Sequence, residues 1–332
     1  MTTTDSQDYL FQRIKELLPH DISMVDAISE ILNVSSDSAY RRIRGETPLV
    51  LEEAKQLCDK FHLSLDQLLG IRSGFTIFQT ERVHYKNFSF EKYLRSILEQ
   101  MQQLNGFIKK EIIYLSKDLP FFHNFSNEPL FAFHYFFWMK SILRHPDFED
   151  RDFTLDCLTP EIKQLGTDLI QTYNNIPSTE IWNTECINSI IFQVESYKEA
   201  GYFADRNDIR KIYEAVEATI THLKNQAENG CKYLPDENPE LKKNNFKFLY
   251  NRVTLGDNTI MGIADHIKTV FLNYDVMNYM VTRDEKFCNE THNDLLGLIR
   301  RSTLISNSGE KQRNIFFNIL LSKIHDRKHN LL

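Results

Sequence analysis

The stretch that most constrains this chain is residues 33–46, NVSSDSAYRRIRGE, which predicts a tight turn followed by a short helix. Asn33 suits the turn because asparagine tolerates a left-handed backbone. Ala39 and Ile43 lie four residues apart and form the inward-facing pair of the helix. Gly45 ends it. The helix carries three arginines, Arg41, Arg42 and Arg44.

Amphipathic segments on both sides of this stretch predict four further helices. Apolar residues recur at helical spacing in residues 9–18 and again in residues 23–32. Thr47 followed by Pro48 predicts the cap and first turn of a fourth helix, and a last short helix follows. Residues 1–72 are therefore expected to form one five-helix domain.

This five-helix domain, from Tyr9 to Ile71, resembles the helix-turn-helix domain of phage-repressor or Cro-type (XRE) transcriptional regulators. The most specific strings are SAYRRIRGE and LEEAKQLCDKFHLSLDQLL, which are similar to those of Bacteroidetes-type regulators with a long α-rich C-terminal region. The resemblance implies a lambda-repressor-like DNA-binding domain whose recognition helix, residues 36–44, enters the major groove of double-stranded DNA. Such regulators usually act as homodimers, with recognition helices about 34 Å apart.

The predicted DNA-binding residues are Ser35, Ser36, Asp37, Tyr40, Arg41, Arg42 and Arg44. By the resemblance, the positions that meet base edges fall at Ser36, Asp37 and Arg41. Ser35 and Arg44 fall where the family meets phosphate. The arginine fork can bond guanine O6 and N7 together, which is worth about 1–3 kcal/mol of discrimination per base pair.

The sequence leaves open which of Arg41 and Arg42 contacts DNA, because the resembled family buries an aliphatic residue where Arg42 stands. Tyr40 can reach the sugar-phosphate backbone through its hydroxyl. Asp37 can accept from a cytosine amino group, or can simply complement the positive end of its helix. An ordinary solvated helix face would also explain the arginines.

Charge limits the classes of DNA-binding protein. The net charge of −7 excludes a histone-like protein that coats DNA by bulk charge. Residues 1–72 contain eight Lys and Arg against twelve Asp and Glu, so any DNA contact must be local. This acidic balance motivates a second hypothesis, a protein-interaction module whose helix-turn-helix fold no longer binds DNA.

The rest of the chain is predicted to be mainly α. Residues 73–88 form a linker, and residues 89–332 form an α-rich region that dimerises, senses an effector, or both, with a possible subdivision near 231–245. Helices are expected in residues 90–104, 160–173, 187–197, 209–223, 291–302 and 312–328. Residues 129–143 are dense in Phe, Tyr and Trp. Residues 246–274 predict a small antiparallel β hairpin or meander, and residues 111–115 are a further strand candidate.

Aromatic residues are concentrated between positions 121 and 138. They are Phe121, Phe122, Phe125, Phe131, Phe133, Tyr135, Phe136, Phe137 and Trp138. Aromatic side chains are enriched in ligand pockets and at dimer surfaces, so a third hypothesis is a peptide- or metabolite-gated repressor with its pocket here. The core of a helical domain explains the cluster more simply.

No metal, cofactor or catalytic site is predicted. His123 and His134 lack a cysteine or acidic partner at helical spacing, and His325 and His329 lie where a helix end favours positive charge. No HExxH, GxSxG, P-loop or GxGxxG motif occurs, so the chain is not expected to be an enzyme.

Cysteine spacing and hydropathy predict a cytoplasmic protein without a membrane segment. The five cysteines lie 29 or more residues apart and form no CxxC, which argues against a disulfide framework or a zinc ribbon. The polar N-terminus is unlike a signal peptide. The most apolar run, residues 130–139, falls far short of the about 20 residues that span a bilayer.

Overall fold

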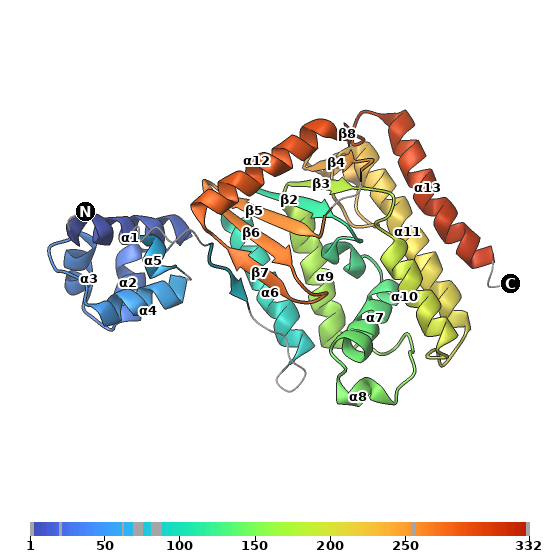
Figure 1. Cartoon of the computed structure of the whole chain (residues 1–332), viewed down its shortest axis with the longest axis horizontal. Coiled ribbons are helices and arrows are strands. Elements are labelled where there is room, and N and C mark those ends of the chain that lie inside the picture. Colours follow the sequence, from blue (N-terminus) through green and yellow to red (C-terminus); the bar gives the residue numbers. More distant parts are fainter. Residues whose placement is uncertain are drawn as a thin grey trace.

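The computed structural model describes residues 3–19, 22–61, 63–68, 76–80, 88–253 and 256–329. Figure 1 shows a small group of N-terminal helices beside a larger body built on a β-sheet. We call residues 3–68 the helix-turn-helix unit and residues 76–329 the sheet unit. No described helix combines the length and the apolar character that crossing a membrane requires.

The helix-turn-helix unit contains five helices around its own core. They are α1 (Thr3–Leu17), α2 (Met24–Leu32), α3 (Ser36–Ile43), α4 (Leu51–Phe61) and α5 (Leu65–Leu68). Ile14, Ile28 and Leu57 are fully buried between them. The predicted start of the fourth helix at Pro48 is wrong, because α4 begins at Leu51. The backbone N–H of Val50, just before it, donates to the Glu53 carboxylate at 3.3 Å.

The sheet unit is built on eight strands in the order β1-β7-β6-β5-β2-β3-β4-β8. Their bounds are β1 (Gln79–Thr80), β2 (Lys110–Ser116), β3 (Ser178–Trp182), β4 (Phe246–Tyr250), β5 (Thr259–Ala264), β6 (Ile267–Asn273), β7 (Tyr279–Thr282) and β8 (Thr303–Leu304). β2, β3 and β4 run parallel, and the other neighbours pair antiparallel. The prediction of only a small hairpin or meander near residues 246–274 is therefore wrong.

The strand positions within 246–274 were predictable, but their partners were not. β5 and β6 form an antiparallel pair, joined at a turn where Asp265 has a left-handed φ of 53°. β4 instead lies parallel to β3, far from β5 in the sheet. Strands on both sides of the possible boundary at 231–245 belong to this one sheet.

The helices of the sheet unit cover both faces of the sheet. They are α6 (Phe90–Gly106), α7 (Glu128–Phe137), α8 (Pro146–Glu149), α9 (Pro160–Asn175), α10 (Asn188–Glu199), α11 (Asn207–Asn229), α12 (Glu285–Arg301) and α13 (Glu310–His329), with short turns η2 (Phe121–Phe125), η3 (Trp138–Ile142) and η4 (Pro239–Leu241). α9 begins at Pro160, as predicted, and Thr159 caps it. α12 begins before the predicted Thr291, because Asp284 caps it through the N–H of Phe287 at 2.8 Å.

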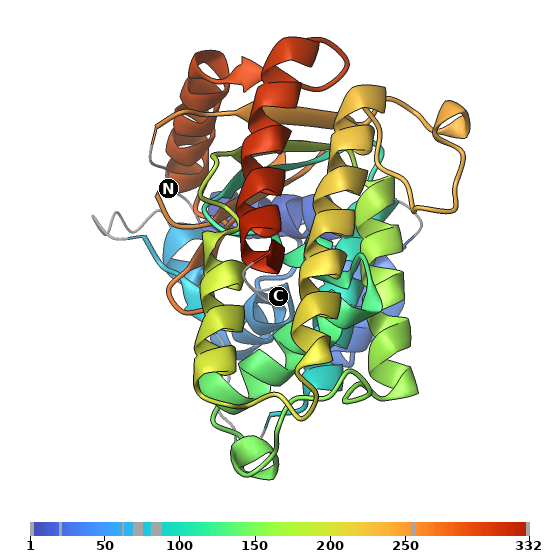
Figure 2. The ribbon, with the colours of Figure 1, turned by 90° about the vertical axis from the view of Figure 1, so that its right-hand side faces the viewer.

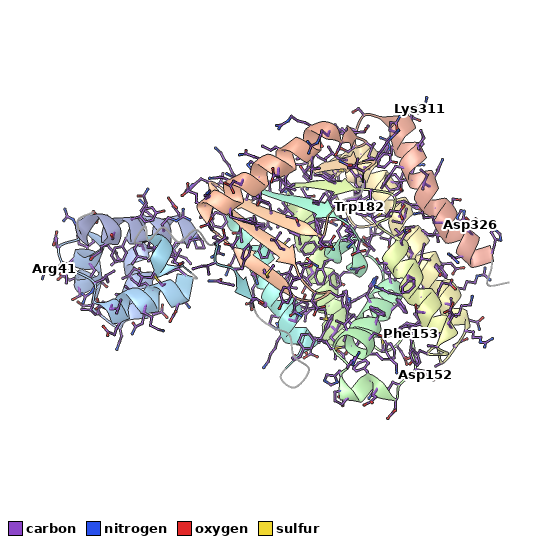
Figure 3. All side chains as sticks on the ribbon, in the orientation of Figure 1. Arg41, Asp152, Phe153, Trp182, Lys311 and Asp326 are labelled. Atoms are coloured by element: carbon purple, nitrogen blue, oxygen red, sulfur yellow. The ribbon has the colours of Figure 1, made fainter. Side chains whose placement is uncertain are left out.

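Each face of the sheet has its own apolar core. α12 packs on one face through Cys288 and Leu295, against Ile181 and Leu249. The remaining helices of the sheet unit lie on the other side of the sheet, as Figure 1 shows. Trp182, labelled in Figure 3, is fully buried in the core on that side. Figure 2 shows α13 running along α11.

An ion-pair cluster joins α13 to α11. Glu217 of α11 lies 2.7 Å from the imidazole of His325 and 2.6 Å from the ammonium of Lys328. His325 thus has a carboxylate partner on a neighbouring helix. No group of three or more His, Cys, Asp and Glu side chains among the described residues is arranged to hold a metal ion.

The aromatic cluster lies mostly in the core on the same side of the sheet as Trp182. Phe122 stacks on Tyr173 with ring centroids 4.3 Å apart, and Phe133 stacks on Phe203 at 6.1 Å. Phe121 and Phe137 are half-buried, and the other members are buried. The buried His134 bonds the carbonyl of Leu130 at 3.1 Å. This packing agrees with the core interpretation of the cluster.

A glutamate is buried in the middle of the same core. The Glu180 carboxylate lies 3.0 Å from His123 Nε2, and it accepts from the Tyr173 hydroxyl at 2.5 Å and from Trp182 Nε1 at 2.9 Å. The buried Lys232 donates to the Tyr173 carbonyl at 2.6 Å. Burial acts to raise the pKa of Glu180, but the interactions with His123 and Tyr173 outweigh it and lower that pKa.

Candidate nucleic-acid interface

The turn between α2 and α3 is held by backbone bonds and a serine cap. Asn33 adopts φ 51° and ψ 48°, the left-handed conformation predicted for it. The N–H of Val34 bonds the Ser29 carbonyl at 3.0 Å, which closes the end of α2. Ser35 Oγ then accepts from the N–H of Ser38 at 3.2 Å and starts α3. These bonds fix the angle at which α3 leaves α2.

The other end of α3 depends on a glycine. Gly45 has φ 74°, a conformation that a residue with a side chain adopts only at a cost. Its N–H bonds the Arg42 carbonyl at 3.0 Å, and the N–H of Glu46 bonds the Arg41 carbonyl at 2.9 Å. Ala39 has no exposed surface and anchors α3 in the core of the unit. The helix is therefore short and held at both ends.

One face of α3 is open to solvent. Among the predicted DNA-binding residues, those exposed are Ser35, Ser36, Asp37, Tyr40, Arg41 and Arg44. The side chains of Arg41 and Arg44 are 56% and 58% exposed. Figure 3 shows Arg41 at the end of the molecule opposite the sheet unit. A duplex can thus approach this face without meeting the larger part of the chain.

The charges on this face form weak surface contacts. Glu46 lies 4.0 Å from Arg41 and 3.5 Å from Arg44. The Arg44 guanidinium also lies 5.4 Å from the centre of the Tyr40 ring. Exposed ion pairs are worth at most about 1 kcal/mol, so a phosphate can take the place of the Glu46 carboxylate.

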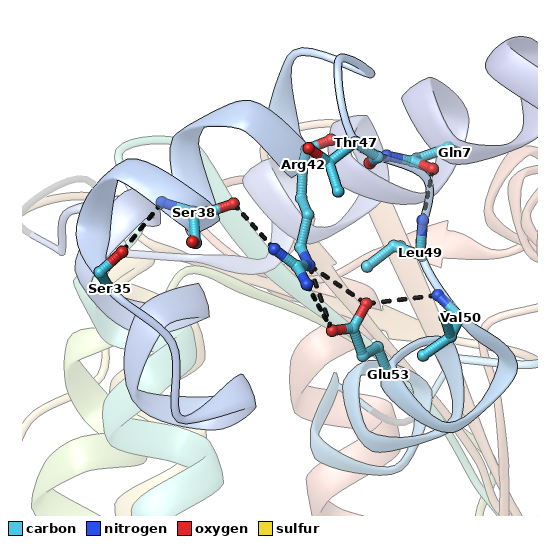
Figure 4. A network of polar contacts seen from close by, with 8 residues as sticks. All are labelled: Gln7, Ser35, Ser38, Arg42, Thr47, Leu49, Val50 and Glu53. Atoms are coloured by element: carbon cyan, nitrogen blue, oxygen red, sulfur yellow. Dashed lines mark hydrogen bonds and ion pairs between the residues drawn. The ribbon is translucent and has the colours of Figure 1, made fainter.

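Arg42 lies apart from the other predicted DNA-binding residues. Because successive helix residues are about 100° apart, Arg41 and Arg42 point in different directions. The Arg42 guanidinium bonds the Glu53 carboxylate of α4 at 2.8 and 3.1 Å and the Ser38 carbonyl at 3.2 Å (Figure 4). Its side chain is only 17% exposed. Hydrogen bonding to Arg42, more than any other contact, lowers the pKa of Glu53. Arg42 therefore joins α3 to α4.

The comparisons with known proteins bear on this unit alone. Residues 8–77 match the family model of the BetR domain. This is a helix-turn-helix-like DNA-binding domain, and the match agrees with the arrangement of α1 to α5. No match to the chain was found among curated proteins or among solved structures. Membership of the XRE family in particular stays a prediction.

The sequence did not predict that Gln7 of α1 positions α3, which lies within the BetR match. The Gln7 side chain of α1 donates to the carbonyls of Arg42 at 2.7 Å and Thr47 at 2.9 Å. It accepts from the N–H of Leu49 at 2.9 Å, as Figure 4 shows. A single glutamine in a polar N-terminal segment gives no sequence signal for such a role. Its three partners lie 35 or more positions away.

We expect Gln7→Ala to destabilise the helix-turn-helix unit by about 1–3 kcal/mol, because it leaves partly buried backbone groups unpaired. Hydrogen exchange of the amides of α3 and of residues 46–50, followed by mass spectrometry, would measure the change. Gln12→Ala is the matched control, since Gln12 is an exposed residue of the same helix. Equal amide exchange rates in Gln7→Ala and Gln12→Ala would show that Gln7 does not position α3.

Proposed function

We propose that this chain is a sequence-specific DNA-binding transcriptional regulator and that α3 is its recognition helix. The observation that carries the proposal is that one face of α3 is exposed. The helix is held at both ends and lies within the BetR match. In this proposal the chain is a regulator rather than an enzyme, it acts in the cytoplasm, and it belongs to the XRE type.

Each exposed residue of α3 has a chemical role in the proposal. Arg41 offers its guanidinium fork to guanine. Ser36 and Asp37, in the first turn of the helix, meet base edges. Ser35 and Arg44 hold phosphates from the two ends of the helix. Tyr40 adds a backbone contact through its hydroxyl. Arg42 is assigned a positioning role in place of a DNA contact.

The proposed active form is a homodimer. A two-fold dimer places two α3 helices about 34 Å apart, in successive major grooves on one side of the duplex. The sheet unit is then the part that dimerises, responds to an effector, or does both.

Selection of bound sequences from random duplex DNA tests the proposal, using the full-length protein at two salt concentrations. We expect enrichment of an inverted repeat with half-sites about one helical turn apart. Affinity should fall steeply with salt, because phosphate contacts release counterions. Enrichment of no sequence by the folded protein would reject the proposal.

The acidic balance of residues 1–72 and the position of Glu46 favour a second candidate, a protein-interaction module. Glu46 partly neutralises both exposed arginines of α3. A partner held mainly by apolar contacts would bind with little dependence on salt. Capture of such a partner, together with failure of the DNA selection, would establish this alternative.

A further inference from the structure

A cleft of about 320 Å³ lies where the helix-turn-helix unit meets the sheet unit. Its lining includes Tyr9 and Arg13 of α1 on one side, and residues of β6 and the first turns of α12 on the other. Two contacts between described residues cross the junction. Glu16 of α1 lies 3.2 Å from the imidazole of His266, and Arg283 donates to the Phe61 carbonyl at 3.5 Å. Small-molecule sites occupy about 300–1,000 Å³, so the cleft is large enough for a small ligand.

The cleft has an excess of positive charge. Arg13, Lys268 and Arg283 line it, against the carboxylates of Glu16 and Glu285. Arg13 is paired with Glu16 at 2.7 Å. Lys268 and Arg283 form no ion pair with a carboxylate of the described residues. The lining of the cleft therefore has one more cation than it has carboxylates.

Arg283 has only neutral acceptors among the described residues. Its hydrogen-bond acceptors are both neutral, the Thr269 hydroxyl at 3.2 Å and the Phe61 carbonyl at 3.5 Å. No carboxylate of the described residues forms an ion pair with it. Burial, and next the positive charge of Arg13, lower the pKa of Arg283. A partly buried guanidinium beside a like charge is costly unless an anion joins it.

Lys268, like Arg283, has only a neutral hydrogen-bond acceptor among the described residues. Its ammonium donates to the Asn289 side-chain carbonyl at 2.7 Å, which is a neutral acceptor. Lys268 belongs to β6 and Arg283 follows β7, so the rigid sheet fixes the separation between them. Arg13 faces them from α1. The three cations therefore line one cleft, Arg13 from the helix-turn-helix unit and Lys268 and Arg283 from the sheet unit.

We propose that this cleft binds a small anionic ligand, a carboxylate or a phosphate, through Arg283 and Lys268. The bound anion contacts α1 as well, relieves the repulsion between Arg13 and Arg283, and links the helix-turn-helix unit to the sheet unit. In a dimer this link sets the position of each α3. That regulatory consequence rests on the proposed function, whereas the binding itself does not.

Calorimetric titration of the full-length protein with inorganic phosphate and with succinate, at matched ionic strength, tests the binding. We expect at least one probe to bind, and the tighter probe identifies the anionic group. Arg283→Gln and Lys268→Gln should each weaken binding by about tenfold or more. Arg210→Gln is the matched control, because this exposed arginine of α11 is paired with Glu214, away from the cleft.

The titration results either support or reject the proposed anion site. Weaker binding in either cleft variant, with Arg210→Gln unchanged, supports the site. The site is rejected when neither probe binds the wild type, or when both cleft variants bind as the wild type does. Arg283→Gln should keep its stability without ligand, because it removes a partly buried charge beside Arg13.

The regulatory consequence needs a separate measurement. Affinity for the selected DNA is compared with and without phosphate, in the wild type and in Arg283→Gln. A response in the wild type alone supports coupling between the two sites, and equal responses reject it. Failure of the DNA selection would leave the ligand titration unaffected, so the two proposals fail independently.

Discussion

We expect Glu180→Gln to lower the free energy of unfolding of the sheet unit by about 3–5 kcal/mol, the usual cost of removing one partner from a buried ionic group. The carboxylate is fully buried and has three hydrogen-bond partners, His123, Tyr173 and Trp182. Glutamine has nearly the same shape, but it takes away the negative charge near the buried Lys232 side chain. Burial lowers the pKa of Lys232 to about 7, and the charge of Glu180 acts to raise it.

The effect of Glu180→Gln should depend on pH. Because folding lowers the pKa of Glu180, its stabilising contribution is fully present above the pKa of an unfolded glutamate. It is lost as the pH falls through the lower, folded value, where the wild type becomes protonated. The difference between wild type and variant should therefore be largest near neutral pH and shrink in acid.

Urea unfolding followed by tryptophan fluorescence measures this difference selectively. The chain has two tryptophans, and both Trp138 and Trp182 are buried in the sheet unit. Fluorescence therefore reports on that unit without the helix-turn-helix unit. Glu199→Gln is the control, since Glu199 is an exposed residue at the end of α10. A loss in Glu180→Gln no larger than in the control would refute a structural role for the buried carboxylate.

Glu180 also shows why the sheet could not be predicted from the sequence. β3 reads STEIW, and all five residues are buried. A charged residue within five positions argues against a buried strand, because burying a charge without partners is costly. The partners that remove this cost, His123 and Tyr173, lie outside the strand. Without β3 the parallel centre of the sheet cannot be inferred, and β4 lacks its parallel neighbour.

The helix-turn-helix unit was predictable because its signals are local. Asn33 in the turn, the Ser35 cap and the inward Ala39 act within a few residues of one another. The same reasoning placed the start of α9 at Pro160. It misplaced the start of α4, where Gln7 of α1 holds the Thr47 carbonyl and the Leu49 N–H. Local patterns therefore predicted the helices but not the contacts that position them.

The choice between Arg41 and Arg42 depended on a contact of this kind. The two are adjacent and chemically identical, so the pattern of the helix does not separate them. Glu53, eleven positions away on α4, bonds Arg42 and leaves Arg41 free to meet a ligand. Because of this contact, we expect replacement of Arg41 and replacement of Arg42 to have different effects.

We expect Arg41→Ala to weaken binding to the selected DNA by about ten- to a hundredfold, the range of a bidentate contact with a base. The variant should fold as stably as the wild type, since the Arg41 side chain is 56% exposed and its nearest carboxylate lies 4.0 Å away. Discrimination at one base pair should relax with it. Lys55→Ala, which removes an exposed cation from α4, is the control and should change neither property.

Arg42→Ala should instead destabilise the helix-turn-helix unit and weaken DNA binding only as a consequence. It leaves the Glu53 carboxylate half-buried without its cation, so replacing Glu53 as well should restore part of the lost stability. Glu53→Ala should give no such coupling with Arg41→Ala. Thermal unfolding and DNA titration of five variants, Glu53→Ala alone and Arg41→Ala and Arg42→Ala each with and without it, measure both quantities. If Arg42→Ala kept its stability yet lost base discrimination, Arg42 and not Arg41 would be the residue that reads DNA.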